Sequence, residues 1–159
     1  MGLKVLRNKA KLKNNDKLFF IDKYYKPDLP LNLTKYLFKF ANSSIDVSDG
    51  LIDDLSKMIN RQTLSFHLFE KKIPVSKKLS NLIKKQKLNK INLISNGDDY
   101  QVLFTADVNK ARIIQNASKT TGIKITKIGK IISGKDRSLI FDEKGKQKHA
   151  KYKGYIHRF

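Results

Sequence analysis

The sequence predicts an α+β fold, in which helices flank a mixed β-sheet, and three observations support this prediction. Short apolar or alternating segments at 43–47, 64–69 and 100–105 are typical of strands. Segments with apolar residues at helical spacing separate them, without the regular strand-helix-strand order of a doubly wound sheet. The 159 residues, 40% of them hydrophobic, are enough for a single domain with one core.

Residues 1–42 are expected to form helices that lead into this core. Residues 2–13 and 16–26 each predict a basic helix, and the asparagine pair at 14–15 is a turn signal between them. Asn32 is expected to cap a third helix, because its side-chain oxygen can accept a hydrogen bond from the first helical turn.

Residues 43–159 are expected to form the α/β core of the domain. The elements expected there are a strand at 43–47, a helix that begins near Ser48 or Asp49, a strand at 64–69, a helix at 76–87, a strand at 100–105, a helix at 107–121, strands at 123–132 and 138–141, and a turn at 142–148. In the first of these helices, Asp53, Asp54 and Lys57 are expected on the polar face, opposite the apolar stripe.

The formal net charge of +20, from 34 basic and 14 acidic residues, favours polyanionic partners. A basic nucleic-acid-binding domain is therefore an alternative function. Lysine is spread along the whole chain, however, and the sequence has no RNA-binding aromatic motif. Arginine, the usual side chain for base recognition, occurs at Arg7, Arg61, Arg112, Arg137 and Arg158. We therefore do not expect specific recognition of nucleic acid.

Composition also bears on the compartment. The chain has no cysteine, which excludes disulfides and thiolate metal sites. It has no charged-then-apolar leader and no long uncharged apolar run. These features predict a cytoplasmic protein without a membrane partner.

Two carboxylates and a hydroxyl lie close together in the segment IDVSDGL at 45–51. If the following helix begins at Ser48 or Asp49, these residues lie at a helix N-terminus, where N–H groups favour an anion such as a phosphate. Asp46 and Asp49 are candidate ligands for Mg²⁺, which prefers carboxylate oxygens and often shares them with substrate phosphates. The spacing alone is also typical of an ordinary N-cap that follows a strand.

A second block, SNGDDYQVLF at 95–104, lies well downstream. Together the two blocks resemble the thiamine-phosphate kinase family, in which I-D-x-S-D-G-L is followed by G-G-E-D-Y-E-L-L-F. Smaller family-like pieces keep the same order, namely YKP at 25–27, IPVS at 73–76, IGKI at 128–131 and GYIH at 154–157. The resemblance therefore extends over most of the chain.

The resemblance implies the fold of the C-terminal domain of aminoimidazole ribonucleotide synthetase, which belongs to the same superfamily as selenophosphate synthetase. It also implies Mg²⁺-assisted transfer of the γ-phosphoryl group of ATP to thiamine phosphate, which gives thiamine diphosphate. By the same resemblance, Asp46 and Asp49 would bind Mg²⁺ and Ser48 would contact an ATP phosphate. Asp98 would contact thiamine phosphate, and Tyr155 would pack against its cationic thiazolium ring.

The chain also departs from the family. In the second block Asn96, Asp98 and Gln101 replace Gly, Glu and Glu, and Asp99 remains an alternative to Asp98, although it is the expected structural acceptor. The family's N-terminal ATP-binding domain, with its further metal ligands, is expected to be absent. A partner that supplies that domain, or a homodimer, would then complete the protein. A non-catalytic remnant or split subunit is therefore a second hypothesis.

Overall fold

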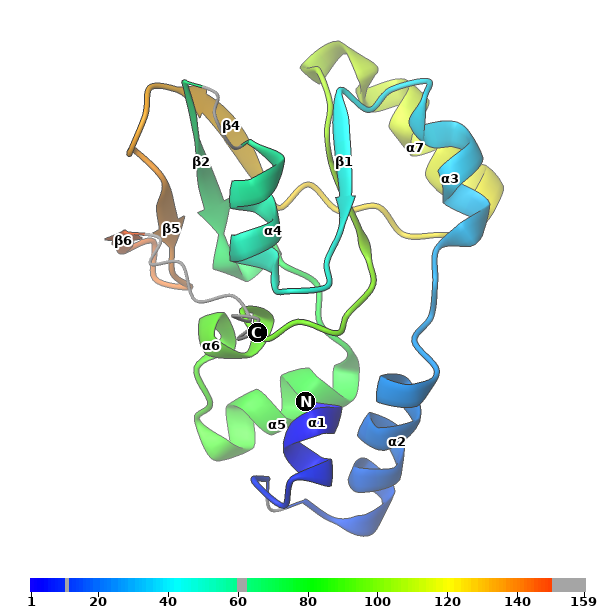
Figure 1. Ribbon diagram of the computed structural model, residues 1–159, viewed down its shortest axis with the longest axis vertical. Helices are drawn as coiled ribbons and strands as arrows, with labels where there is room; N and C mark the ends of the chain where they lie inside the picture. The colour runs from blue at the N-terminus through cyan, green and yellow to red at the C-terminus, as the bar shows by residue number, and fades with distance from the viewer. Residues whose placement is uncertain (11, 60–62, 150–159) are drawn as a thin grey trace, which may run out of the picture.

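The computed structural model describes residues 1–10, 12–59 and 63–149, and it has the α+β architecture expected from the sequence (Figure 1). Its strands in these ranges form two sheets. One has four strands in the order β4-β2-β5-β6, and the other pairs β1 with β3. The four-stranded sheet is mixed, because β2 runs parallel to β5 and antiparallel to β4.

The elements have the following bounds. The helices are α1 (Gly2–Leu6), α2 (Asn14–Tyr25), α3 (Leu31–Leu37), α4 (Leu51–Met58), α5 (Lys77–Gln86), α6 (Lys90–Ile94) and α7 (Ala111–Thr121), with the 3-10 helices η1 (Glu70–Lys72) and η2 (Val108–Lys110). The strands are β1 (Ser43–Asp46), β2 (Leu64–Phe69), β3 (Val102–Thr105), β4 (Gly129–Ser133), β5 (Leu139–Phe141) and β6 (Gln147–His149).

The largest apolar cluster joins α4 to the four-stranded sheet (Figure 1). Ile52 and Leu55, one helical turn apart on α4, are buried in the same cluster as Phe66 and Leu68 of β2. Phe66 and Leu68 are each 1% exposed, and burial of such side chains stabilises a fold by about 2 kcal/mol each. The start of α4 is therefore attached to a rigid part of the molecule.

The leading helices pack at two different places. Helices α1 and α2 pack against α5 through Val5, Phe20 and Leu82. Helix α3 instead packs against α7, where Leu33 and Ala117 belong to one buried cluster. Figure 1 shows α3 and α7 at the upper right, beside β1, and α1, α2 and α5 at the bottom of the molecule.

Several boundaries in the leading helices differ from those expected. Helix α1 ends at Leu6 instead of continuing to residue 13, and Asn8 adopts a left-handed conformation with φ of 53°. The break thus comes earlier than the asparagine pair, and Asn14 begins α2. Asn32 lies inside the first turn of α3, whose N-cap is Pro30, so the expected cap was wrong.

The core contains elements that the periodicity did not indicate. Helix α6 was not expected, and the expected strand at 123–132 is limited to β4. Strand β6 occupies part of the expected turn at 142–148. The Asp142 carboxylate accepts hydrogen bonds from the N–H groups of Lys144 and Lys146, at 2.9 Å each, and this closes a tight hairpin between β5 and β6.

No helix in the described ranges is both long enough and apolar enough to cross a bilayer.

Candidate active site

The two sequence blocks lie side by side because their backbones are hydrogen-bonded. Strands β1 and β3 pair antiparallel, and the ladder continues past their ends, where the N–H of Val47 donates to the carbonyl of Gln101 at 2.9 Å. The N–H of Tyr100 donates to the carbonyl of Val47 at 2.9 Å, and that of Asp98 to the carbonyl of Ser48 at 2.8 Å. Residues some fifty positions apart in the sequence therefore form one site.

Two glycines allow this close approach. A Cβ atom placed on Gly97 would lie 1.7 Å from the carbonyl oxygen of Ser48, which no side chain could tolerate without movement of the backbone. A Cβ atom on Gly50 would lie 2.5 Å from the carbonyl oxygen of Ser95, and Gly50 has a φ of +126°. Each block thus supplies a glycine at the place where the other block's backbone touches it.

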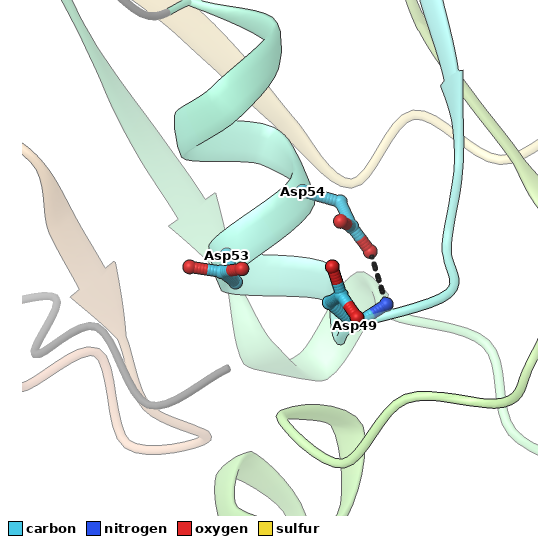
Figure 2. A group of neighbouring side chains, drawn as sticks. All are labelled: Asp49, Asp53 and Asp54. Carbon is cyan, nitrogen blue, oxygen red and sulfur yellow. Dashed lines mark hydrogen bonds between the residues drawn. The ribbon is translucent and has the colours of Figure 1, made fainter. Parts of the chain in front are cut away.

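Helix α4 begins later than expected, at Leu51, with Gly50 as its N-cap. Ser48 and Asp49 therefore belong to the turn before the helix, and the expectation that they begin it was wrong. The reason is Asp54, whose Oδ2 atom accepts hydrogen bonds from the N–H groups of Asp49 and Gly50, both at 3.0 Å. Figure 2 shows this carboxylate turned toward the turn, with the bond to Asp49 dashed.

Asp54 does not lie on the polar face of the helix, where it was expected. It was expected among the polar, solvent-facing residues but is only 1% exposed. Burial of a carboxylate is costly unless hydrogen bonds compensate it, and the two N–H groups of the turn supply that compensation.

Three carboxylates gather at this helix start. Asp49, Asp53 and Asp54 each have a carboxylate oxygen within 4.8 Å of the others (Figure 2). The ammonium of Lys57 lies 2.5 Å from Asp49, 2.7 Å from Asp53 and 3.5 Å from Asp54. Its hydrogen bonds to Asp49 and Asp53 raise the pKa of Lys57 above its ordinary value. The position thus already accommodates one positive charge.

This donor set fits a hard divalent cation, because it consists of closely spaced carboxylate oxygens. The group that the structure assembles includes one of the two expected ligands, Asp49. Asp46 is exposed at the end of β1, on the other side of the turn, and is outside this group. The sequence analysis did not propose Asp53, Asp54 or Lys57.

The second block contains a strained backbone. Asp98 and Tyr100 have φ values of 67° and 51°, in the left-handed region that residues other than glycine rarely adopt. Such conformations cluster at functional sites, where surrounding contacts hold them. Asp99 lies between these two residues in the sequence, and desolvation raises its pKa to about 6 from an ordinary value of 3.8. This desolvation occurs although the side chain retains accessible surface, because Asp99 lines a concave region.

That concave region has a volume of about 2190 Å³ and connects the two blocks with the leading helices. Ser48, Asp49, Asp98 and Asp99 all line it, together with Tyr24 of α2. The site therefore opens onto a space large enough for ligands of nucleotide size.

Comparisons with known proteins find thiamine-monophosphate kinases. No family model matches the chain. The thiamine-monophosphate kinase of Buchnera aphidicola subsp. Acyrthosiphon pisum is 33% identical over 161 residues, which cover 98% of this chain and 48% of that protein. The thiamine-monophosphate kinase of Escherichia coli K12 is 27% identical over 157 residues, again 98% of this chain and 48% of the relative. The chain is similar over almost its whole length to one half of the thiamine-monophosphate kinases.

Solved structures agree with this similarity. The structure of AaThiL complexed with AMPPCP and TMP superposes with a TM-score of 0.71 at 25% identity, over 98% of this chain and 47% of that one. The thiamine-monophosphate kinase of Aquifex aeolicus gives a TM-score of 0.67 over 93% of this chain. Escherichia coli HypE, a hydrogenase maturation protein, shares the fold with a TM-score of 0.64 at 13% identity.

The chain spans about half the length of these thiamine-monophosphate kinases. The resemblance stated from the sequence is thus confirmed for the family. The residue assignments drawn from it remain predictions, and Tyr155 lies outside the described residues. A signal for Asp54 was present in the sequence, because Gly50 has no side chain with which to cap a helix and acidic residues follow it in the first turn.

Proposed function

We propose that this chain carries part of the active site of a thiamine-monophosphate kinase. The reaction moves the γ-phosphoryl group of ATP to the phosphate of thiamine phosphate and yields ADP and thiamine diphosphate. One P–O bond forms to the acceptor phosphate while the bond between the γ-phosphorus and the bridging oxygen of ADP breaks. The observation that carries the proposal is the backbone pairing of the two blocks, in which the N–H of Asp98 donates a hydrogen bond to the carbonyl of Ser48.

The first block would hold the nucleotide end of the reaction. Asp46 and Asp49 would bind Mg²⁺ through carboxylate oxygens, and the grouping of Asp49 with Asp53 and Asp54 supports a cation there. When bound, Mg²⁺ supplies neutralisation of the phosphate charge that builds up during transfer. The Ser48 hydroxyl would donate a hydrogen bond to an ATP phosphate. The complex of AaThiL with AMPPCP supports ATP as the co-substrate.

The second block would hold the acceptor. Asp98 would contact thiamine phosphate, and its bond to Ser48 would keep that substrate next to the nucleotide. Asp99 would be a structural acceptor at the start of the strand. Tyr155 would cover the thiazolium ring through a cation–π contact. The complex of AaThiL with TMP supports this choice of substrate.

The remaining ligands would come from a partner. Because the chain spans about half of its relatives, a chain that supplies the other half, or a homodimer, would complete the site. The second hypothesis is a non-catalytic remnant or split subunit that binds nucleotide but does not turn over alone. The net charge of +20 favours either phosphate ligands or nucleic acid, so charge does not choose between them.

A turnover assay tests this proposal. The chain is assayed for ADP and thiamine diphosphate, first alone and then together with the part of the Buchnera aphidicola relative that the match leaves out. We expect Mg²⁺-dependent turnover in the combined sample and none in a sample with Asp49→Ala. Turnover by the chain alone would exclude the remnant hypothesis, and full turnover with Asp49→Ala would exclude the assigned metal site.

A further inference from the structure

Asp54 belongs to the carboxylate group at the start of α4, but it differs from Asp49 because it is deeply buried and binds the backbone of the turn. It is 1% exposed, and its Oδ2 atom accepts two hydrogen bonds from consecutive backbone N–H groups, those of Asp49 and Gly50. A carboxylate that accepts two N–H groups at 3.0 Å holds the peptide between them in one orientation.

Asp54 belongs to a helix that is firmly packed in the core. Its neighbours Ile52 and Leu55 are 2% and 5% exposed and are anchored in the largest apolar cluster. The start of the turn is held in the core by Val47, which is 5% exposed and belongs to the same cluster. At the end of the turn, Gly50 has a φ of +126° and no side chain of its own. The Asp54 carboxylate therefore links this end of the turn to the core.

The contact also controls where the Asp49 carboxylate lies. The backbone N–H of Asp49 is bonded to Asp54, so rotation of this residue's backbone would break that bond. The other oxygen of Asp54 lies 3.5 Å from the Lys57 ammonium, which contacts Asp49 as well. Asp54 thus acts on the backbone of Asp49 directly and on its side chain through a shared partner.

We propose that Asp54 is a positioning residue, which fixes the turn at 47–50 so that Asp49 is held ready for a divalent cation. The cation role rests on the proposed function, whereas the fixing of the turn does not. What matters in this account is the location of an acceptor oxygen and not the negative charge of the side chain.

Two variants separate location from charge. Asp54→Asn keeps an oxygen in the same place and loses the charge, whereas Asp54→Glu keeps the charge and shifts the oxygen by one methylene. Asp54→Ala removes both. The matched control is Ser65→Ala, because Ser65 is also 1% exposed and also binds backbone groups, those of Gly134 and Arg137, but lies away from the site.

The readouts are amide hydrogen exchange at Asp49 and Gly50, and calorimetric titration of the chain with Mg²⁺ and ATP. We expect Asp54→Ala to speed exchange at these two amides and to weaken Mg²⁺-dependent ATP binding, each by roughly tenfold or more. Asp54→Asn should remain within about threefold of the original chain on both readouts, which is rescue by the conservative variant. Ser65→Ala should leave both readouts unchanged even where it lowers stability.

The outcomes are distinguishable. Should Asp54→Ala fail to fold, Asp54→Asn and Asp54→Glu decide. Weak ATP binding by Asp54→Asn together with retained ATP binding by Asp54→Glu would mean that the negative charge matters and would overturn the proposal. Unchanged exchange in Asp54→Ala would overturn the fixing of the turn. Faster exchange with unchanged ATP binding would overturn the link to Asp49. If the original chain binds no ATP, the proposed function fails, and exchange alone still decides whether Asp54 fixes the turn.

Discussion

The two blocks of the candidate site are held in place in different ways. The turn at 47–50 is stabilised by a side chain, since Asp54 accepts two of its backbone N–H groups and belongs to a helix anchored in the core. In the block at 95–101, the side chains of Ser95 and Asn96 donate hydrogen bonds to carbonyl groups of α6, at the start of the block. Its N–H groups at Asp98 and Tyr100 are bonded to the backbone of the first block, and both residues are left-handed.

This difference indicates an order of dependence. The first block is built on the core, and the second block takes its shape from the first. The strain at Asp98 and Tyr100 persists because the bonds to Ser48 and Val47 hold it. A substitution at the junction, where the backbones of the two blocks touch, should therefore affect the second block most. Changes in the charges of the first block should alter cation affinity with little effect on the fold.

The largest effect is expected from a change at the junction. In Gly97→Ala the added methyl group would lie 1.7 Å from the Ser48 carbonyl oxygen, so the two blocks must separate. We expect the free energy of unfolding to fall by roughly 3 kcal/mol, measured by denaturant titration.

Gly122→Ala is the matched control for this change. It also adds a methyl group to a glycine, at a φ of +68°, but nothing lies within 4 Å of the new atom. It should cost about 1 kcal/mol from backbone strain alone. Equal losses in the two variants would contradict the role of Gly97 at the junction.

A smaller effect is expected at Asp99, and it should depend on pH. Its pKa is raised to about 6 in the folded chain, from 3.8, so the folded state binds a proton more tightly than the unfolded state between these values. Stability therefore falls as the pH rises from about 4 to 6, and the penalty stays above that range. Asp99→Asn removes the penalty and should stabilise the chain by about 1 kcal/mol at pH 8, since solvent screening reduces the full effect of the shift.

The measurement for Asp99 is thermal unfolding at several pH values between 4 and 8. The difference between Asp99→Asn and the original chain should grow from pH 4 to about pH 6 and then stay constant. A constant difference over the whole interval would rule out the desolvation of this carboxylate.

The smallest effect on stability is expected at Lys57. Its side chain is 45% exposed and its ammonium bridges three carboxylates, so Lys57→Met should lower stability by about 0.5 kcal/mol at low salt. Cation affinity should rise, because the ammonium no longer competes for Asp49. Calorimetry with Mg²⁺ measures this change.

Lys78→Met provides the comparison for Lys57. The Lys78 side chain is 42% exposed, and its ammonium lies 3.7 Å from the Asp16 carboxylate. The variant therefore loses a similar surface ion pair, far from the carboxylate group. Its variant should bind Mg²⁺ as the original chain does. The same Mg²⁺ affinity in both variants would mean that Lys57 does not compete with a cation.

Local patterns predicted many of the elements well. Strands β1, β2 and β3 and helices α5 and α7 agree with the alternating or helical spacing of their apolar residues. Helix α6 has five residues, too few for a period to be visible, and it depends on the Asn89 side chain as its cap. Strand β6 depends on the turn made by Asp142, which brings a strongly polar segment beside β5.

The site was less predictable, because its geometry depends on contacts between distant segments. The pairing of β1 with β3 places Asp46 opposite Val102, and no periodicity encodes that partner. The family resemblance named both blocks, but it did not place them in contact. The role of Asp54 could not be predicted, because a helical period assigns a carboxylate to the solvent face. In the structure, two backbone N–H groups bind this carboxylate in a buried position.

The most direct test of the central claim is calorimetric titration of the purified chain with ATP and Mg²⁺ and then with thiamine phosphate. A double variant, Asp46→Ala with Asp49→Ala, and a short RNA serve as controls. The account predicts Mg²⁺-dependent binding of ATP that the double variant loses. No such binding, together with salt-sensitive binding of the RNA, would contradict it and would favour a basic nucleic-acid-binding domain.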